Sequence, residues 1–263
     1  MYFGFDNISI QYGKMPVVRG FTAEIPKGQV VTLIGQNGCG KSSLLKTISR
    51  AVSPVSGRIL YEDRDLRDWP SRTVAQKIGY LAQVHSASPD IDVRTLVSYG
   101  RYPHTRFGRS LGKKDREIID RSLELTGLTG LRDASLGNLS GGELQRAWIA
   151  LSLCQEPEIL VLDEPTTYLD VRYQVEVLEL IRGLNRSQGI TILMVLHDLN
   201  LAARYSDLLY AVAGGRLYAG GTPREILTEP VIREVFQVES RICEDPLHHC
   251  PYFIPLKNPR EDS

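Results

Sequence analysis

The feature that most constrains the fold of this chain is the run Gly35-Gln36-Asn37-Gly38-Cys39-Gly40-Lys41-Ser42. The apolar, β-branched segment 29–34 before it is typical of a buried strand, and the segment 42–48 after it is typical of a helix. In such a loop the glycines let backbone N–H groups point at a bound anion, and the helix N-terminus adds partial positive charge. The sequence therefore predicts an α/β fold in which this loop binds the phosphates of a nucleoside triphosphate.

The side chains of the loop predict individual roles. Lys41 is expected to reach the β- and γ-phosphates, and the hydroxyl of Ser42 is expected to ligate Mg²⁺. The residues predicted to contact the nucleotide here are Gly35, Gln36, Asn37, Gly38, Cys39, Gly40, Lys41, Ser42 and Ser43.

Composition argues against several classes of partner and location. The 263 residues include 31 basic and 31 acidic side chains, so no overall charge attracts nucleic acid or an anionic membrane surface. No apolar run approaches the roughly 20 residues that cross a bilayer, and residues 1–6 lack the pattern of a secretion signal. The four cysteines show no CxxC spacing and are expected to be free thiols. We therefore expect a protein of the cytosol or of the cytosolic face of a membrane.

Changes of hydrophobic period divide the chain. Alternation within residues 3–25 predicts a small antiparallel sheet, and helical spacing from about residue 93 to residue 153 predicts a mostly helical insertion. The apolar runs 159–162 and 190–195 each follow a helix-like segment, as in a parallel sheet with crossover helices. The predicted organisation is an α/β core with an antiparallel subdomain at about 1–86 and 156–238, a helical subdomain at about 87–155, and an irregular tail at 239–263.

Two adjacent carboxylates, Asp163 and Glu164, follow the apolar run 159–162 directly. This position is the carboxyl edge of the sheet, where open α/β folds bind ligands. Asp163 is expected to hold Mg²⁺ through its water shell, and Glu164 to deprotonate the water that attacks the γ-phosphorus. An acidic pair at this place also commonly caps a helix. Behind a phosphate-binding loop, the catalytic interpretation is favoured.

A second glycine-containing helix start lies shortly before this strand. Ser140-Gly141-Gly142 offers a hydroxyl and two unobstructed N–H groups that can bind a γ-phosphate, and Glu143 follows in the first turn. Since the first loop is already expected to hold a triphosphate, this second phosphate-binding motif is best assigned to the nucleotide of a neighbouring molecule. With these motifs the chain resembles the ATP-binding cassette family, in which two cassettes sandwich two ATP molecules head to tail.

The resemblance covers nearly the whole chain and implies roles for four further residues. Tyr12 matches the aromatic residue that stacks on adenine, and Gln83 matches the glutamine that reaches Mg²⁺ or the attacking water. Asp170 matches the loop that links the two composite sites, and His197 matches the histidine that contacts the γ-phosphate beside Glu164. By themselves, these side chains would be interpreted as core packing, a solvated loop, a helix N-cap and a satisfied polar residue, respectively.

The same resemblance implies the fold and the reaction. The expected fold is a P-loop NTPase (RecA-like) core with an N-terminal antiparallel β-subdomain and an inserted helical subdomain. The expected activity is hydrolysis of ATP with Mg²⁺, in which Glu164, His197 and Lys41 are the catalytic residues. Ser42, Gln83 and Asp163 are the residues expected at the metal.

Local runs at 100–104, 195–200 and 244–246 are similar to those of importer ATPases for iron-siderophores, haem and cobalamin. This similarity implies two transmembrane permease subunits and a second copy of the chain as partners, with a periplasmic or lipid-anchored substrate-binding protein as an indirect one. The chain would then lie peripherally on the cytoplasmic face of the cell membrane, without nucleic acid as a partner. Two alternatives stay open: an importer ATPase for zinc or manganese ions, and a soluble cassette that acts on nucleic acid or ribosomes.

Two patterns leave weaker alternatives. The tail segment 243–250 contains two cysteines and two histidines, which admits a soft-metal site although the spacing typical of zinc sites is not met. An interrupted basic run could bind nucleic acid, but its interruptions favour a solvated surface. That run consists of Arg101, Arg106, Arg109, Lys113, Lys114 and Arg116.

Overall fold

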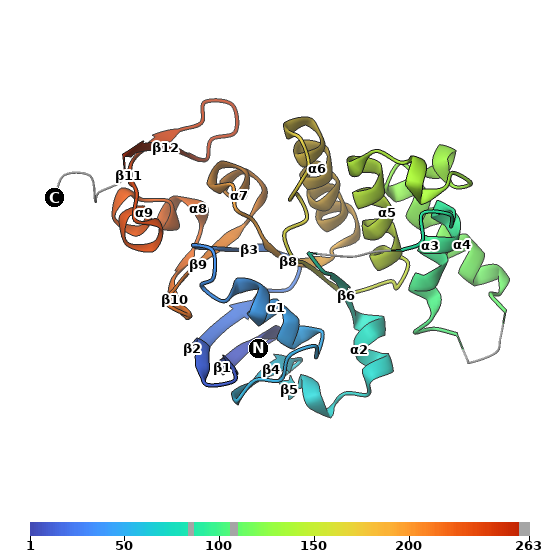
Figure 1. Ribbon diagram of the computed structural model, residues 1–263, viewed down its shortest axis with the longest axis horizontal. Coiled ribbons are helices and arrows are strands. Elements are labelled where there is room, and N and C mark those ends of the chain that lie inside the picture. The colour runs from blue at the N-terminus through green and yellow to red at the C-terminus, as the bar shows by residue number, and fades with distance from the viewer. Residues whose placement is uncertain (84–86, 106–109, 258–263) are drawn as a thin grey trace. The chain divides into compact units, whose positions relative to one another are not determined.

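A computed structural model describes residues 1–83, 87–105 and 110–257 of the chain. The chain forms two compact units, one made of Met1–Asp68 with Leu193–Ser263 and the other of Trp69–Ile192 (Figure 1). The second unit is thus inserted into the sequence of the first. Besides the predicted helical segment, this unit also holds two parallel strands and a long helix. Its limits therefore do not test the limits predicted for the helical subdomain, which stay a prediction.

The N-terminal part of the first unit is an antiparallel sheet with the strand order β2-β1-β4-β5. Its strands are β1 (Phe3–Tyr12), β2 (Met15–Ile25), β4 (Ser56–Tyr61) and β5 (Arg64–Asp65). The aromatic residues Phe3 and Phe5 of β1 are buried, and the Phe5 ring meets Phe21 of β2 edge to face with centroids 5.4 Å apart. The small antiparallel sheet predicted from residues 3–25 is confirmed, and β4 and β5 extend it.

The phosphate-loop segment folds as expected into a strand, a loop and a helix. Strand β3 (Val30–Ile34) is buried at every residue, and helix α1 (Lys41–Ile48) begins just after the glycine run. Strand β9 (Leu208–Ala213) pairs with β3 in parallel, and β10 (Arg216–Gly221) pairs with β9 antiparallel. On its other side β3 neighbours β8 (Thr191–Val195), which is also buried throughout and leads into α7 (Leu199–Tyr205).

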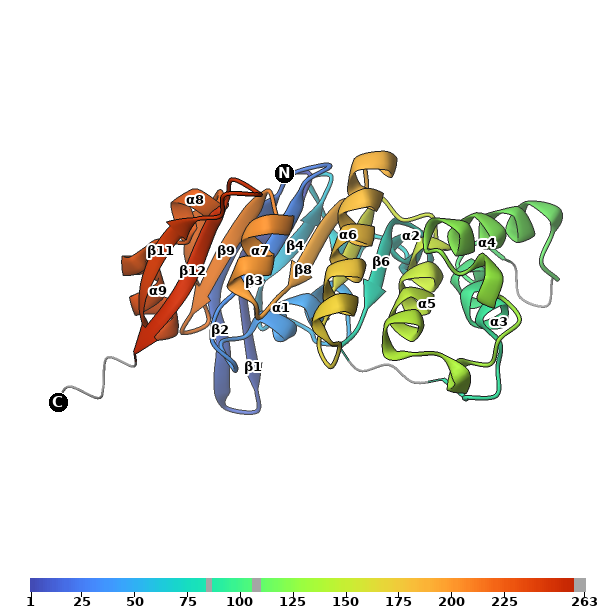
Figure 2. The same cartoon turned by 90° about the horizontal axis from the view of Figure 1, so that it is seen from above.

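The C-terminal segment is ordered, and the prediction of an irregular tail is wrong for the part that the structure describes. After the short helices α8 (Pro223–Ile226) and α9 (Glu229–Phe236), strands β11 (Glu239–Glu244) and β12 (Pro251–Lys257) form an antiparallel hairpin, coloured red in Figure 2. Prolines suggested irregularity, yet Pro251 opens β12, where a missing N–H is tolerated. The side chain of Asn200 in α7 also supports the hairpin, because it accepts from Phe253 N at 2.7 Å and donates to Phe253 O at 3.2 Å.

The structure does not support the alternative interpretation of the tail segment 243–250 as a metal site. Among the residues that the structure describes, no group of three or more His, Cys, Asp or Glu side chains is placed to hold a metal ion. Asp245 instead accepts from the backbone N–H groups of Leu247 and His248, and Arg224 donates to Glu244. These contacts explain the polar residues of the hairpin turn as local structure.

The second unit combines two parallel strands with helices. Helix α2 (Ser71–Lys77) precedes β6 (Ile78–Leu81), β6 pairs in parallel with β7 (Ile159–Leu162), and the long helix α6 (Val171–Gln188) follows β7. Between β6 and β7 lie α3 (Val93–Ser98), α4 (Lys113–Leu125) and α5 (Gly141–Leu153), with short 3₁₀ turns η2 (Tyr99–Arg101), η3 (Thr129–Leu131) and η4 (Leu136–Asn138). These helices share an apolar core that includes Val93, Leu96, Ile119 and Ala147, which confirms the predicted helical segment.

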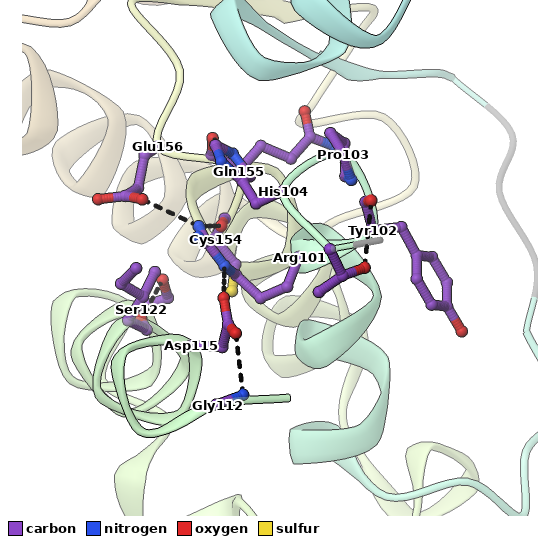
Figure 3. Close-up of polar contacts among 12 residues, drawn as sticks. Arg101, Tyr102, Pro103, His104, Gly112, Asp115, Ser122, Cys154, Gln155 and Glu156 are labelled. Carbon is purple, nitrogen blue, oxygen red and sulfur yellow. Dashed lines mark hydrogen bonds and ion pairs between the residues drawn. The ribbon is translucent and has the colours of Figure 1, made fainter. Parts of the chain in front are cut away.

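Arg101 lies inside this helical segment, and its interpretation as solvated surface is wrong (Figure 3). The residue is 3% exposed, and its guanidinium donates to Asp115 at 3.0 Å, to Glu156 at 3.0 Å and to the backbone oxygen of Cys154 at 2.7 Å. A cation can be buried when carboxylates and carbonyl oxygens replace its water. Arg101 therefore joins η2 to the start of α4 and the end of α5.

The other basic residues of that run divide into two groups. Lys113, Lys114 and Arg116 are exposed on α4, as a solvated surface predicts, whereas Arg106 and Arg109 lie outside the described residues. In the described part of the chain, no helix has the length and apolar character needed to cross a membrane. The four cysteines are free, as expected, and burial raises the pKa of the Cys154 thiol to about 11.

Candidate nucleotide site

The phosphate loop presents an uncapped helix start. Gly40 is the N-cap of α1, has φ = 105° and makes no side-chain cap hydrogen bond. A Cβ at this position would lie 2.7 Å from Val18 Cγ2, so both the conformation and the space require glycine. Backbone N–H groups at such a helix start, together with the helix dipole, suit an anion.

Lys41 folds back over the loop. It is 5% exposed, and its ammonium donates to the backbone oxygens of Gly35 at 2.7 Å and Gln36 at 2.9 Å, with Cys39 Sγ at 3.7 Å. These neutral acceptors are weaker partners than phosphate oxygens, because hydrogen bonds between two ionised groups are stronger. The donors of the loop therefore fit a polyphosphate.

Tyr12 and Ser43 are brought together beside the loop. The Tyr12 hydroxyl donates to Ser43 Oγ at 3.3 Å, and the residue is 48% exposed. The interpretation of Tyr12 as core packing is therefore wrong, because about half of the residue's surface is exposed. Its stacking on adenine stays a prediction.

His197 is exposed at the end of β8, just before α7. Asp198 caps α7 by accepting from Asn200 N at 2.8 Å and Leu201 N at 2.9 Å, which fixes the backbone beside the histidine. His197 also lines a cavity of about 540 Å³, together with Phe253 of the C-terminal hairpin and other residues. Its contact with a γ-phosphate stays a prediction.

In the second unit, the strand register places Gln83 beside Glu164. Leu81 of β6 is level with Leu162 of β7, and Gln83 and Glu164 each lie two positions beyond this pair. Gln83 Nε2 donates to Glu164 Oε2 at 2.7 Å. Asp163, 1% exposed, is held by its N–H, which donates to Leu81 O at 2.9 Å.

Thr167 is a residue of this group to which sequence reasoning gave no role. Its hydroxyl donates to the same oxygen, Glu164 Oε2, at 3.0 Å. Glu164 itself has φ = 55°, a left-handed conformation that is uncommon for a residue with a side chain and often marks functional sites. A hydroxyl three positions after an acidic residue was the only signal in the sequence.

Ser140 and Glu143 close the start of α5 as a capping box. Ser140 Oγ and Ser140 N donate to Glu143 Oε2 at 2.7 Å and 2.8 Å, and Glu143 N donates to Ser140 Oγ at 3.4 Å. Hydrogen bonds from the Ser140 hydroxyl and backbone N–H lower the pKa of the Glu143 carboxyl. The hydroxyl predicted to meet a neighbour's phosphate is thus already oriented at the helix start.

The two glycines of this motif have different surroundings. Gly141 is exposed, whereas Gly142 is buried, and a Cβ on Gly142 would lie 2.3 Å from the Tyr173 ring of α6. Packing of α5 on α6 is therefore sufficient to require glycine at 142. Asp170 caps α6 by accepting from Tyr173 N at 3.1 Å, in agreement with the interpretation of this residue from sequence alone.

Comparison with known proteins places the chain in a family. Residues 18–167 match the model of the ABC transporter family. The chain is 43% identical over 251 residues to the ferric enterobactin transport ATP-binding protein FepC of Escherichia coli K12, covering 95% of this chain and 93% of the relative. It is 42% identical over 260 residues to the iron(3+)-hydroxamate import ATP-binding protein FhuC of Bacillus subtilis 168, covering 97% and 96%.

A solved structure is similar to this chain over nearly its whole length. It is an inward-facing conformation of an ABC transporter assigned to the metal-chelate type, with a TM-score of 0.84, 26% identity and 97% of each chain covered. The predicted P-loop ATPase fold, with its antiparallel subdomain, is confirmed by this likeness and by the sheets described above. The chain belongs to the ABC transporter family.

Proposed function

We propose that this chain is the ATP-hydrolysing subunit of an importer for a metal chelate of the iron-siderophore type. The observation that carries this proposal is its 43% identity over 95% of its length to a ferric enterobactin transport ATPase. Relatives that serve hydroxamate, petrobactin and cobalamin import share 38 to 42% identity, so the chelate class is better supported than any one chelate.

The loop 35–43 would bind the triphosphate of ATP. Gly40 leaves the start of α1 open to the phosphates, and Lys41 would exchange its two carbonyl partners for phosphate oxygens. The Tyr12 ring beside Ser43 would pack on the base. These contacts orient the γ-phosphorus for in-line attack.

Glu164 would take the proton of the attacking water, with Gln83 and His197 orienting that water. The Gln83 amide already lies 2.7 Å from the Glu164 carboxylate, within one hydrogen bond of where the proton is accepted. Ser42 and Asp163 carry the hydroxyl and carboxylate oxygens that suit Mg²⁺, with Gln83 as a further oxygen donor. When bound, Mg²⁺ supplies charge stabilisation at the phosphate oxygens.

A second copy of the chain would complete each site. Ser140, Gly141 and Gly142 would meet the γ-phosphate of the nucleotide held by the neighbouring copy. ATP then favours the closed pair because it binds both copies only in that state, and hydrolysis removes this preference. From the cytoplasmic face of the cell membrane, the pair would pass this motion to two transmembrane permease subunits, with a substrate-binding protein on the far side supplying the chelate.

The proposal is tested by isolating the tagged chain from its own cells with its membrane partner and reconstituting the complex in vesicles. We expect ATP-dependent uptake of a ferric siderophore, measured with radioactive iron, and no uptake with Glu164→Gln. Uptake of free zinc or manganese ions in place of chelates, or isolation with ribosomes and without a membrane protein, would contradict it.

A further inference from the structure

We propose that Thr167 is a positioning residue that holds the carboxylate of Glu164 in the orientation required for proton transfer. This inference rests on the proposed role of Glu164 as the general base. It assigns a role to Thr167, a residue to which the sequence motifs gave none.

Two hydrogen bonds hold the Oε2 atom of the Glu164 carboxylate. Thr167 Oγ1 donates to Oε2 at 3.0 Å, and Gln83 Nε2 donates to the same atom at 2.7 Å. A carboxylate oxygen has about two lone-pair positions, so these donors occupy Oε2. Holding this oxygen from two sides fixes the orientation of the whole carboxylate group.

The two donors differ in how firmly they are attached. Thr167 also donates its backbone N–H to Glu164 O at 3.2 Å, so its hydroxyl and its backbone both bind the same residue across one turn. Gln83 is exposed and reaches Glu164 from the end of another strand. Thr167 is therefore the local constraint, which does not depend on the position of the other strand end.

The turn itself is shaped to bring this hydroxyl back to the carboxylate. Glu164 has φ = 55° and Tyr168 has φ = 66°, so left-handed residues lie at the acidic residue and just after the threonine. Such conformations are uncommon for residues with a side chain and persist where the surroundings determine them. Tyr168 is 92% exposed, so packing of its side chain does not explain its conformation.

The matched variants are Thr167→Val, which keeps the shape but removes the donor, and Thr167→Ser, which keeps the donor but removes a methyl group. We expect Thr167→Val to lower kcat for ATP hydrolysis by about 10- to 100-fold, the loss typical of a misplaced catalytic group. The KM for ATP should change by less than about twofold, because no phosphate contact is removed. Thr167→Ser should retain kcat within about threefold.

Two results would overturn the inference: a kcat for Thr167→Val equal to that of the unaltered protein, or equal losses in Thr167→Val and Thr167→Ser, since those would indicate packing. If Thr167→Val does not fold, as judged by thermal unfolding, Thr167→Ala compared with Thr167→Ser provides the same test. Glu164→Gln is assayed in parallel. If it hydrolyses ATP at the full rate, the proposed base itself is wrong, whereas loss of activity in Glu164→Gln with normal Thr167→Val contradicts only the positioning role.

Discussion

Glu164 has a left-handed backbone conformation, and its carboxylate accepts hydrogen bonds from Gln83 and Thr167. Neighbouring Asp163 is buried at 1% exposure, while Glu164 is half-buried. The adjacent acids therefore have different surroundings, which is how similar groups acquire different roles in one site.

Replacement of Glu164 by Gln tests the assignment of the base. We expect hydrolysis to fall by at least about 100-fold, because a general base contributes on the order of 10² to 10⁴ in rate. ATP binding should persist, since the amide keeps the size of the side chain. Phosphate release and nucleotide affinity are the measurements, and Glu179→Gln on α6 is the control. Full turnover in Glu164→Gln would show that the proton goes elsewhere.

At the scale of elements, the helical segment depends on the cation at the junction of η2, α4 and α5. Arg101→Met keeps the apolar stem but removes the hydrogen bonds that the guanidinium donates to Asp115, Glu156 and the Cys154 carbonyl. We expect the free energy of unfolding to fall by about 3 kcal/mol, as for other broken buried ion pairs. Arg132→Met, an exposed change in the same segment, should cost less than about 0.5 kcal/mol. Equal urea midpoints for the two variants would contradict this account.

The same junction predicts a dependence on pH. Burial opposes ionisation of Asp115, but hydrogen bonds from Gly112 N–H and Arg101 outweigh it, so the pKa of Asp115 lies below its ordinary value of 3.8. A carboxyl with a lowered folded-state pKa stabilises the fold above 3.8 and loses that contribution as the pH falls through the folded value. Asp115→Asn should therefore be less stable than the unaltered protein at pH 7.

In urea unfolding, this difference should shrink as the pH is lowered below 3.8. Asp133→Asn, whose side chain is 79% exposed, is the control and should show little difference at either pH. A gap between Asp115→Asn and the unaltered protein that does not change with pH would mean that the charge of Asp115 is not the cause.

At the scale of the whole molecule, the proposed function requires two copies of the chain. In the Glu164→Gln variant, bound ATP should not be hydrolysed. This variant should therefore sediment as a dimer with ATP and as a monomer without it. Ser140→Ala should remove the dimer while ATP still binds, because the serine would contact only the neighbour's nucleotide. A dimer that forms equally well with Ser140→Ala would contradict the composite site.

This test needs two controls. Ser140 also caps α5, and loss of an N-cap costs about 1 kcal/mol, so thermal unfolding must show that Ser140→Ala is folded at the assay temperature. Ser187→Ala, an exposed position on α6, should leave dimer formation unchanged.

The sequence by itself determined the elements and motifs that depend on local chemistry. The strand, loop and helix around residues 35–42, the antiparallel start, the helical segment and the acidic end of β7 all follow from hydrophobic period and glycine placement. Within these elements, capping by Ser140 with Glu143 and by Asp170 is also local, because partners three residues apart are adjacent at any helix start.

Only the tertiary structure decided the contacts between distant segments. The register of β6 and β7 places Gln83 beside Glu164, and three segments converge on Arg101 and make burial of a cation possible. Likewise, the hydrogen bond from Phe253 N to the Asn200 side chain supports a hairpin in the segment that was predicted from its prolines to be irregular. Periodicity reports which face of an element is apolar, whereas these pairings depend on how elements far apart in the chain pack, which a local pattern does not encode.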